Sequence, residues 1–377
     1  MTAALPAAAA VSPARVADER AENTGLTALR GTAIFVVLYH FMAVLLGREY
    51  PEHTQLFIRA HLLVDGFFML SGYVICWMYR RQFEDGFRVS RYAGYLAKRL
   101  ARIYPMHFAA MLAMLVLWWW QYGPRFGPFG VDQAANFPWR PFFRHATMSQ
   151  SWWVDNPLTL NAPAWSVSVE WAAYLAFPIL LAIGSWLARR PLYLAFLLPF
   201  LAAVALAALN PERQLNLHDI RGVLRGWIDF TIGIMLFQAM RTRPDHRLWD
   251  VLGKDGVVAA LFLAVPVAMH FGVPDPVTLM LIAFLVAGAS RCRGWMGRAM
   301  ASAVPNWLGV ASYSIYLNHW PVLTLWLFLH GRTVVIGEAA DTLIYLLVVL
   351  AVSAVTFPLI EAPGRRWLRR AFARIGV

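Results

Sequence analysis

Residues 28–46 read ALRGTAIFVVLYHFMAVLL, a stretch that is apolar apart from an arginine near its start and a histidine in its second half. An α-helix of about 20 such residues crosses the hydrocarbon core of a bilayer. Comparable apolar stretches recur along the rest of the chain, at 61–79, 103–122, 165–187, 191–209, 223–240, 255–271, 277–290, 307–329 and 342–361. The sequence therefore predicts an all-α polytopic membrane bundle of about ten transmembrane helices.

The amino-acid composition excludes an ordinary soluble domain. Hydrophobic residues make up 59% of the chain and charged residues only 14%, whereas soluble domains carry about 25% charged residues. The net charge of +12 would suggest nucleic acid as the partner of a soluble protein. Here the basic residues gather in short loops between apolar stretches, a pattern typical of loops that face anionic lipid. We therefore expect a lipid bilayer, and no nucleic acid, as a partner.

The distribution of Lys and Arg predicts the orientation of the chain. With the N-terminus in the cytosol, 24 of the 33 basic residues fall on the cytosolic side of the ten spans and 9 on the opposite side. Because cytosolic loops carry the excess of basic residues, we expect both termini in the cytosol. Residues 1–25 are expected to form a flexible tail rather than a cleaved signal peptide, 26–367 a membrane domain and 368–377 a basic cytosolic tail.

The longest predicted loop, 123–164, lies on the outer side and is rich in proline and tryptophan. Its length and aromatic content predict an ordered loop that covers a site opening outward. The chain has only two cysteines, Cys76 and Cys292, both in or beside predicted spans. Neither a disulfide framework nor a metal site is therefore expected.

Ionisable side chains inside a bilayer are costly, so each one in a predicted span is a candidate functional residue. Arg30 and His40 lie ten residues apart on the first span, which places His40 about 15 Å deeper than Arg30. A neutral imidazole near the middle of the membrane can accept a proton from a hydroxyl group. The alternatives are a histidine that packs against a neighbouring helix and an arginine that anchors the helix at the headgroups.

The second and third spans carry further polar groups. Asp65 and Ser71 interrupt the second span, where small residues such as Ser71 and Gly72 would also allow close helix packing. Arg99 and Arg102 lie one turn apart on the third span at its cytosolic border, where a phosphate-bearing cofactor would arrive. Simple membrane anchoring is the alternative for this pair.

The fourth and ninth spans complete the set of candidates. Ser166 and Glu170 begin the fourth span, about one turn in from the outer side, where Glu170 can act as an acid or base or pair with a cation. Tyr316 and His319 place a second histidine in the ninth span.

Six of these segments, in this order, resemble the acyltransferase 3 family of membrane acyltransferases, which includes acetyltransferases of O-antigen, exopolysaccharide, peptidoglycan and Nod factors. The resemblance rests on LRGTAIFVVLYHF, VDGFFMLSGYVI, KRLARIYP, WSVSVE, LGVASYSIYLNHWPV and IEAPGRRW, and it covers about residues 26–367. It implies that 26–367 forms a membrane acyltransferase domain in a multi-pass protein of the bacterial cytoplasmic (inner) membrane.

The resemblance also implies roles for the polar residues. It assigns catalysis to His40 and Glu170 and acyl-donor binding to Arg30, Arg99 and Arg102. The remaining polar groups of the spans would support this site: Asp65, Ser71, Ser166, Tyr316 and His319. His40 would act as a general base or as a nucleophile, oriented by Glu170 or Asp65, of which Glu170 is favoured by the topology.

The implied reaction transfers an acyl group, most commonly acetyl, from cytosolic acetyl-CoA or another acyl-CoA to a carbohydrate hydroxyl, without a metal. The acceptor would be a polysaccharide, a lipid-linked sugar or a glycoside, and a polysaccharide-synthesis machinery would be a partner. Many relatives continue after the glutamate with Glu-Gln-Phe-Tyr, where this chain has Trp171-Ala172-Ala173-Tyr174, a departure that alters acceptor recognition. No hydrolase-like domain is expected after the tenth span.

Two other functions fit a polar path through a membrane bundle. A transporter of a sugar or lipid-linked sugar would also contain intramembrane charges, but it gives no reason for clustered arginines at one end and a histidine deeper along the path. A scaffold of a polysaccharide-synthesis complex would leave the polar path unexplained. Turnover of a thioester by the purified protein separates these readings.

Overall fold

The computed structural model describes residues 24–45, 54–122, 139–155, 157–331 and 333–376. Within these ranges the chain forms α-helices, short 3-10 turns and one π-helical turn, and it contains no β-strand. The predicted all-α class is therefore confirmed. Residues 1–23 of the predicted N-terminal tail lie outside the described residues, whereas the predicted C-terminal tail is helical up to Arg374.

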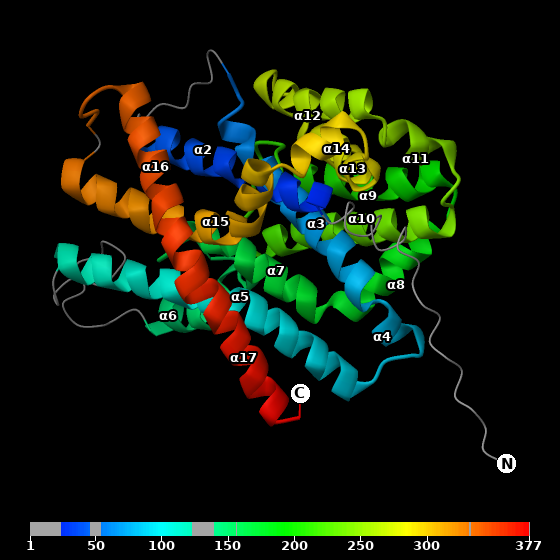
Figure 1. The fold of residues 1–377 in the computed structure, drawn as a ribbon, viewed down its shortest axis with the longest axis horizontal. Coiled ribbons are helices and arrows are strands. Elements are labelled where there is room, and N and C mark those ends of the chain that lie inside the picture. The colour runs from blue at the N-terminus through cyan, green and yellow to red at the C-terminus, as the bar shows by residue number, and fades with distance from the viewer. Residues whose placement is uncertain (1–23, 46–53, 123–138, 156, 332, 377) are drawn as a thin grey trace.

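The long helices follow the apolar stretches of the sequence (Figure 1). They are α2 (Ala33–Leu45), α3 (Leu62–Tyr79), α5 (Val89–Tyr122), α7 (Trp165–Leu175), α8 (Phe177–Ala188), α9 (Leu192–Ala208), α10 (Ile220–Thr242), α12 (Asp255–His270), α13 (Asp275–Arg291), α15 (Ala303–His330), α16 (Glu338–Thr356) and α17 (Ala362–Arg374). The short ones are η1 (Ile58–His61), α4 (Arg81–Glu84), α6 (Trp139–Ala146), η3 (Gln150–Trp152), η4 (Ala162–Ala164), α11 (Arg247–Leu252), α14 (Trp295–Met300) and η5 (Phe357–Glu361).

Among the described residues, five helical runs are long and apolar enough to cross a bilayer: Thr24–Val44, Ile58–Tyr79, Val89–Gln121, Ile220–Thr242 and Glu338–Arg374. A bent pair formed by α7 and α8 would make a sixth. Helices α9, α12 and α13 occupy three more of the predicted spans but have 17, 16 and 17 residues. They fall just short of the roughly 18 residues that mark a confident span.

The predicted span 165–187 is broken in two. Helices α7 and α8 meet at a bend of 77° after Leu175. Pro178 is the second residue of α8, where it cannot donate a backbone N–H to the preceding turn and disfavours a helical conformation for the residue before it. The proline therefore ends α7, and the predicted span 165–187 consists of two helices joined at a bend rather than one continuous helix.

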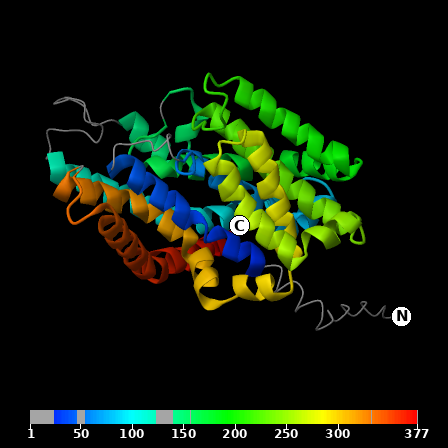
Figure 2. The same ribbon diagram turned by 90° about the horizontal axis from the view of Figure 1, so that it is seen from above.

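The helices pack in two groups, seen from above in Figure 2. Helices α2, α15 and α16 contact one another around a small apolar cluster that includes Phe41 and Tyr345. The larger group is built around α3, α10 and α13 and holds most of the buried apolar residues. The long run from α16 through η5 into α17 crosses α5, as Figure 1 shows.

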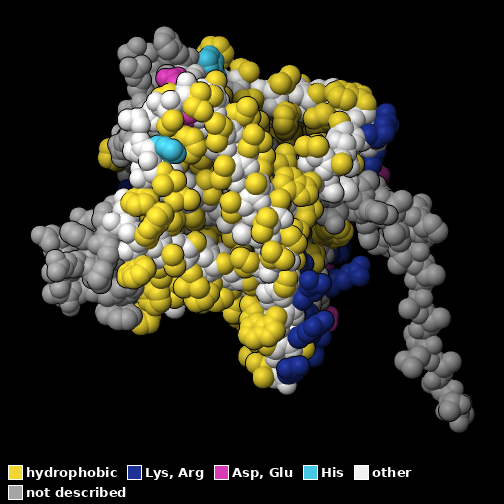
Figure 3. All heavy atoms as spheres, turned by 60° about the vertical axis from the view of Figure 1, so that its left-hand side comes forward, with side chains coloured by type: hydrophobic (Ala, Val, Ile, Leu, Met, Phe, Trp, Pro, Cys, Tyr) yellow, Lys and Arg dark blue, Asp and Glu magenta, His cyan; other side chains and the backbone are white. Residues whose placement is uncertain are grey.

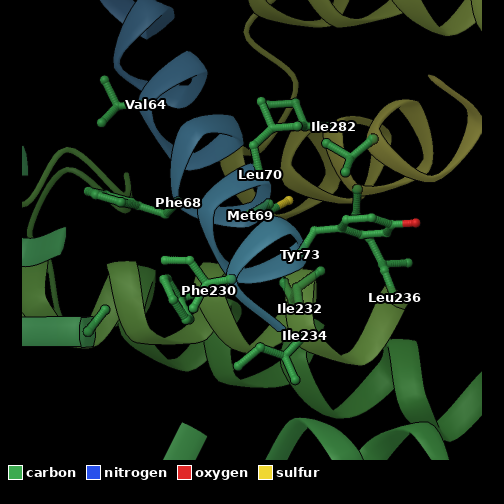
Figure 4. Packing of buried hydrophobic residues seen from close by; sticks show 14 of the residues in the cluster. Val64, Phe68, Met69, Leu70, Tyr73, Phe230, Ile232, Ile234, Leu236 and Ile282 are labelled. Carbon is green, nitrogen blue, oxygen red and sulfur yellow. The ribbon is translucent and has the colours of Figure 1, made fainter. Parts of the chain in front are cut away.

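Two glycines bring α3 and α10 into close contact. A Cβ atom at Gly72 would lie 2.0 Å from the carbonyl oxygen of Phe230, and a Cβ at Gly233 would lie 2.0 Å from that of Met69. Only glycine fits such backbone contact, which is how helices associate in an apolar solvent. Figure 4 shows the buried side chains that surround this crossing.

The outer surface fits a membrane environment. Figure 3 shows hydrophobic side chains over most of one face, while Lys and Arg side chains gather along its margin. Such an apolar surface is too large for a soluble monomer and is covered by lipid tails in a membrane protein. The chain is therefore a helical membrane protein.

Candidate active site

A cavity of about 410 Å³ lies where the two groups of helices meet. Its walls come from the helical residues 24–30 and from α2, α3, α5, α7, α15, η5 and α17. Its charged side chains are Arg30, Arg99, Arg102, Glu170, Glu361 and Arg365. Four arginines thus face two carboxylates, and the cavity carries an excess of positive charge.

Helix α5 contributes two of the arginines from adjacent turns. The Arg99 side chain lies over the ring of Tyr79, 4.8 Å from its centroid, and Nη2 donates a hydrogen bond of 2.7 Å to the Tyr79 hydroxyl. Arg102 pairs through Nη1 with Glu361 and lies 5.5 Å from the ring centroid of Tyr313. Both guanidinium groups are thereby held at the cavity wall.

Glu361 reaches the cavity because of a change in helix type. The turn η5 is π-helical and contains Pro358, and its last residue, Glu361, is buried. π-Helical turns rotate the following side chains and are frequent at functional sites. Besides pairing with Arg102, Glu361 accepts a hydrogen bond of 2.6 Å from Ser314.

Arg30 and Arg365 also line the cavity, from the first and last described helices. Neither side chain forms a hydrogen bond or ion pair with any of the described residues, and both are half-buried. Two guanidinium groups without a carboxylate partner at one cavity are suited to an anionic ligand, because arginine presents a planar fork that matches phosphate oxygens.

Glu170 is fixed by hydrogen bonds from the neighbouring helix α3 and from its own helix α7. Its Oε1 accepts a hydrogen bond of 2.6 Å from Ser71 and one of 2.5 Å from Tyr174. Ser166, one turn earlier on α7, bonds at 3.1 Å to the hydroxyl of Tyr316 on α15. These bonds join α3, α7 and α15 across the cavity.

His40 and His319 form a pair at one end of this cavity. Their rings stack with centroids 5.0 Å apart, and Nε2 of His319 lies 3.0 Å from Nδ1 of His40. Nδ1 of His319 lies 2.5 Å from the carbonyl oxygen of Tyr316. A carbonyl only accepts, so Nδ1 of His319 carries the proton, and in the neutral ring Nε2 is left as an acceptor.

This assignment determines the tautomer of His40. Since Nε2 of His319 accepts, Nδ1 of His40 must donate the hydrogen bond between the rings. The lone pair of the neutral His40 ring then lies on Nε2. The histidine pair therefore presents one basic nitrogen that is not engaged with its partner.

The pair lies beyond the cavity itself. Ala33 and Tyr316 line the cavity on α2 and α15, whereas His40 and His319 do not. His40 is seven residues past Ala33, or about 10 Å along the helix. The expected polar seam is therefore interrupted in this structure between the arginines and the histidines.

The expectation that a carboxylate orients His40 is wrong for the described contacts. Glu170 bonds to Ser71 and Tyr174, and His319 occupies the position at Nδ1 of His40. Asp65 is fully buried in an ion pair with Arg225, whose Nε and Nη2 lie 2.5 and 2.7 Å from its two oxygens. Asp65 is also absent from the cavity lining, so it belongs to the packing between α3 and α10.

Among the described residues, no group of three or more His, Cys, Asp or Glu side chains is arranged to hold a metal ion. The cavity offers instead arginines for an anion and hydroxyl groups for a polar ligand. This lining can bind a negatively charged ligand, and the His40–His319 pair beyond it provides a base.

Comparison with known proteins identifies the family. An acyltransferase-domain family matches residues 23–359, nearly the whole of the described chain. The chain belongs to this family. The acyltransferase assignment made from the sequence motifs, and the assignment to an enzyme, are thereby confirmed.

Two curated relatives of this acyltransferase are similar over 70% of its length. Acyltransferase MdmB of Streptomyces mycarofaciens is 24% identical over 288 residues, which cover 68% of that protein. Peptidoglycan O-acetyltransferase OatA of Listeria monocytogenes is 23% identical over 286 residues, and the chain spans only 44% of its length. No solved structure matches the acyltransferase.

The structure brings most of the predicted site residues of the acyltransferase together. Seven of them line the cavity: Arg30, Ser71, Arg99, Arg102, Ser166, Glu170 and Tyr316. Glu361 and Arg365 were missed as site residues, although both lie in the IEAPGRRW segment that carried the family resemblance. An acidic residue at the end of an apolar stretch was the available signal for Glu361.

Proposed function

We propose that this membrane acyltransferase moves an acyl group, acetyl in the simplest case, from cytosolic acyl-CoA to a hydroxyl group of a carbohydrate. The observation that carries the proposal is that the four-arginine cavity and the His40–His319 pair share helices α2 and α15, with the pair about 10 Å beyond the cavity along α2. Charge recognition and a base are the two elements that such a transfer needs.

The donor half of the proposal rests on charge. Coenzyme A carries a diphosphate and a further phosphate, while its acyl end is uncharged. The arginines that lack a carboxylate partner, Arg30 and Arg365, would bind phosphate oxygens together with Arg99 and Arg102. The Arg102–Glu361 pair would have to loosen for Arg102 to contribute fully.

The chemical step rests on the tautomer of the histidine pair. Nε2 of His40 accepts the proton of the acceptor hydroxyl, and the hydroxyl oxygen bonds to the thioester carbonyl carbon. The carbon–sulfur bond then breaks, and the thiolate of CoA takes the proton back from His40. The same lone pair would also attack the thioester directly if His40 is a nucleophile, with an acyl-imidazole as intermediate.

The pantetheine arm would have to pass the Ser166–Tyr316 hydrogen bond to reach His40, since the cavity ends near Ala33. A carbohydrate acceptor would approach from the opposite side. Support for a carbohydrate comes from the relative named as a peptidoglycan O-acetyltransferase. A polysaccharide-synthesis machinery would supply such an acceptor.

The same proposal includes the placement of the chain. All ten apolar stretches would cross the bacterial inner membrane, the shorter ones among the other helices, with both termini in the cytosol. The support is the 24 to 9 distribution of basic residues. The arginine-lined end of the cavity would then face the cytosol, where acyl-CoA is made.

The test uses the purified protein with acetyl-CoA and follows release of CoA thiol. His40→Ala should lower turnover by roughly 100- to 10,000-fold, the usual contribution of general acid–base catalysis. Arg365→Gln should raise the KM for acetyl-CoA about tenfold or more with little change in kcat, because it removes charge-assisted bonds to phosphate. The matched control is Arg366→Gln, whose side chain is exposed on the same helix.

Thiol release that survives in His40→Ala would remove His40 from the mechanism. An unchanged donor KM in Arg365→Gln would remove α17 from the donor site. A transporter or scaffold would release no thiol with any acceptor, and that result would overturn the proposed function as a whole.

A further inference from the structure

A second cavity lies on the other side of helix α3. It has a volume of about 360 Å³ and is lined at the ends of α3, α10 and α13 by Tyr73, Phe237, Arg241, Ser290, Arg291 and Arg293. Figure 4 shows Tyr73 pointing away from α3 on the side opposite to Val64 and Phe68, which line the active-site cavity. A ligand in the second cavity would therefore not enter the first.

The lining of this cavity carries three arginines and no carboxylate. Arg291 lies 3.5 Å from Asp250, whose side chain is largely exposed. Arg241 bonds through Nε to the amide oxygen of Gln238 at 3.2 Å and forms no ion pair with the described residues. The charges of Arg241 and Arg291 are thus only weakly compensated, because an exposed ion pair is worth little in water.

A fourth arginine stands behind the cavity wall. Arg80 is buried, and its Cζ lies 5.1 Å from the ring centroid of Phe237. Its carboxylate neighbour, Glu84, lies 3.6 Å away with half of its side chain exposed. A buried guanidinium beside Arg241, with only a half-exposed carboxylate as its ion-pair partner, is costly without a further anion. Arg241 and Arg293 are themselves exposed, so a ligand can reach them from outside the bundle.

We propose that this second cavity is a binding site for a phosphate ester, held by Arg241, Arg291 and Arg293. Arginine forks pair with phosphate oxygens in a bidentate way. The other walls, Tyr73 and Phe237, are aromatic and favour a ligand that is apolar next to its phosphate. The headgroup of an anionic phospholipid has this chemistry, and basic pockets between membrane helices on the cytosolic side bind such headgroups. A soluble phosphate ester is the other source.

The experiment measures thermal unfolding of the purified, full-length protein in detergent. Dioleoyl phosphatidylglycerol is titrated in one arm, dioleoyl phosphatidylcholine in a second, and pyrophosphate at matched ionic strength in a third. A ligand that binds only the folded protein raises the unfolding midpoint in proportion to its occupancy. We expect phosphatidylglycerol to raise the midpoint and phosphatidylcholine to leave it unchanged.

The decisive variant is Arg241→Gln combined with Arg293→Gln. Its apparent affinity for phosphatidylglycerol should fall on the order of 25-fold, since each basic residue contributes about a fivefold preference for anionic lipid. The matched control is Arg247→Gln combined with Arg298→Gln, two exposed arginines that do not line the cavity. This control should bind as tightly as the wild type.

The arms separate the two sources of phosphate. A midpoint raised by phosphatidylglycerol alone assigns the site to lipid, and a pyrophosphate shift that is lost in the Arg241→Gln and Arg293→Gln pair assigns it to a soluble phosphate compound; a pyrophosphate shift that the pair retains belongs to the first cavity. No shift in either arm, or equal losses in the variant and the control, would overturn the proposal. If the glutamine pair unfolds in phosphatidylcholine, the Arg241→Lys and Arg293→Lys pair replaces it, with an expected intermediate loss. No readout depends on turnover, so failure here leaves the proposed function untouched.

Discussion

His319 donates from Nδ1 to the carbonyl of Tyr316, and this one hydrogen bond determines which nitrogen of His40 holds a lone pair. In the proposed mechanism His319, one turn beyond the lining residue Tyr316 on α15, would act on the chemistry through the position of a proton. In a serine protease a carboxylate has the corresponding task of holding the catalytic imidazole in one tautomer. Here a neutral imidazole, itself tied to the backbone, takes that place.

The first prediction concerns His319→Gln. The glutamine amide is not tied to the Tyr316 carbonyl, so it no longer imposes one tautomer on His40, and kcat should fall by up to roughly 10,000-fold, the loss found when a catalytic histidine takes the wrong tautomer. The donor KM should stay unchanged, because the arginines are untouched. Steady-state thiol release measures both constants, with His330→Gln, exposed at the end of α15, as the control. Wild-type kcat in His319→Gln would show that the tautomer of His40 is set elsewhere.

The second prediction concerns Asp65, which the structure places in packing rather than in catalysis. Asp65→Asn removes the carboxylate that pairs with the buried guanidinium of Arg225 and leaves only the more distant Asp229 and Asp275 as counter-charges, which should destabilise the protein by about 3 to 5 kcal/mol. Combining Asp65→Leu with Arg225→Met should restore much of the stability, because the pair is replaced by apolar side chains. Unfolding midpoints in detergent test this. A stable Asp65→Asn protein without thiol release would instead return Asp65 to the active site.

The residues of the cavity differ in how far the sequence could identify them. Arg99 and Arg102 are one turn apart on one apolar helix, so local spacing was enough to predict that they act together. The role of Asp65 depends on Arg225, 160 residues later, and no local pattern indicates that pairing. Glu361 faces the cavity only because η5 is a π-helical turn, a departure from regular periodicity that the sequence pattern does not show.

Among the elements, α3 and α10 carry most of the architecture. Gly72 of α3 meets the backbone of α10, and Gly233 of α10 meets the backbone of α3. Apolar length predicted both helices, since each is a single run of buried residues. The break between α7 and α8 was missed, although Pro178 was visible in the sequence, because membrane helices often tolerate proline. At the break the carbonyl oxygen of Leu175 accepts a hydrogen bond of 2.6 Å from the hydroxyl of Tyr92 on α5, a contact between distant segments that the local sequence does not show.

The third prediction tests the crossing of these two helices. Gly233→Ala would place a methyl group against the carbonyl oxygen of Met69, so the helices must separate, at a cost of about 1 to 3 kcal/mol. Gly94→Ala is the matched control, since a Cβ atom there meets no atom within 4 Å. It should be neutral or stabilising by roughly 0.5 to 1 kcal/mol. Equal unfolding midpoints for the two variants would mean that the close contact contributes nothing.

At the scale of the whole molecule, charge and hydrophobic surface are separated. The arginines of the cavity and the basic margin seen in Figure 3 accompany an apolar exterior. In the orientation proposed above, the protein has two aqueous faces that are chemically different. A donor that binds arginines and an acceptor that meets a histidine deeper in the bundle would reach the site from different faces.

The fourth prediction is therefore that transfer is vectorial. In sealed vesicles of known orientation, acetyl-CoA should support acylation only from the face that carries the basic loops, and the acylated sugar should appear on the other face. Protease access to a C-terminal tag reports which face is which. Transfer with both substrates supplied to the basic face alone would place acylation before export, and it would contradict the path through the bilayer.

Helix α3 separates the two cavities, and its close backbone contacts at Gly72 and Gly233 leave it no room to slide against α10. Helix α3 is therefore a fixed wall between the two cavities and does not shift along its axis. A charge bound in one cavity would then change the electrostatic potential in the other. The effect would act across the width of one helix, about 10 Å, and would need no movement of that helix. An anion in the second cavity would weaken the electrostatic attraction between the phosphates of the donor and Arg30 with its neighbouring arginines. Membrane lipid composition would thereby change the affinity of the enzyme for acyl-CoA.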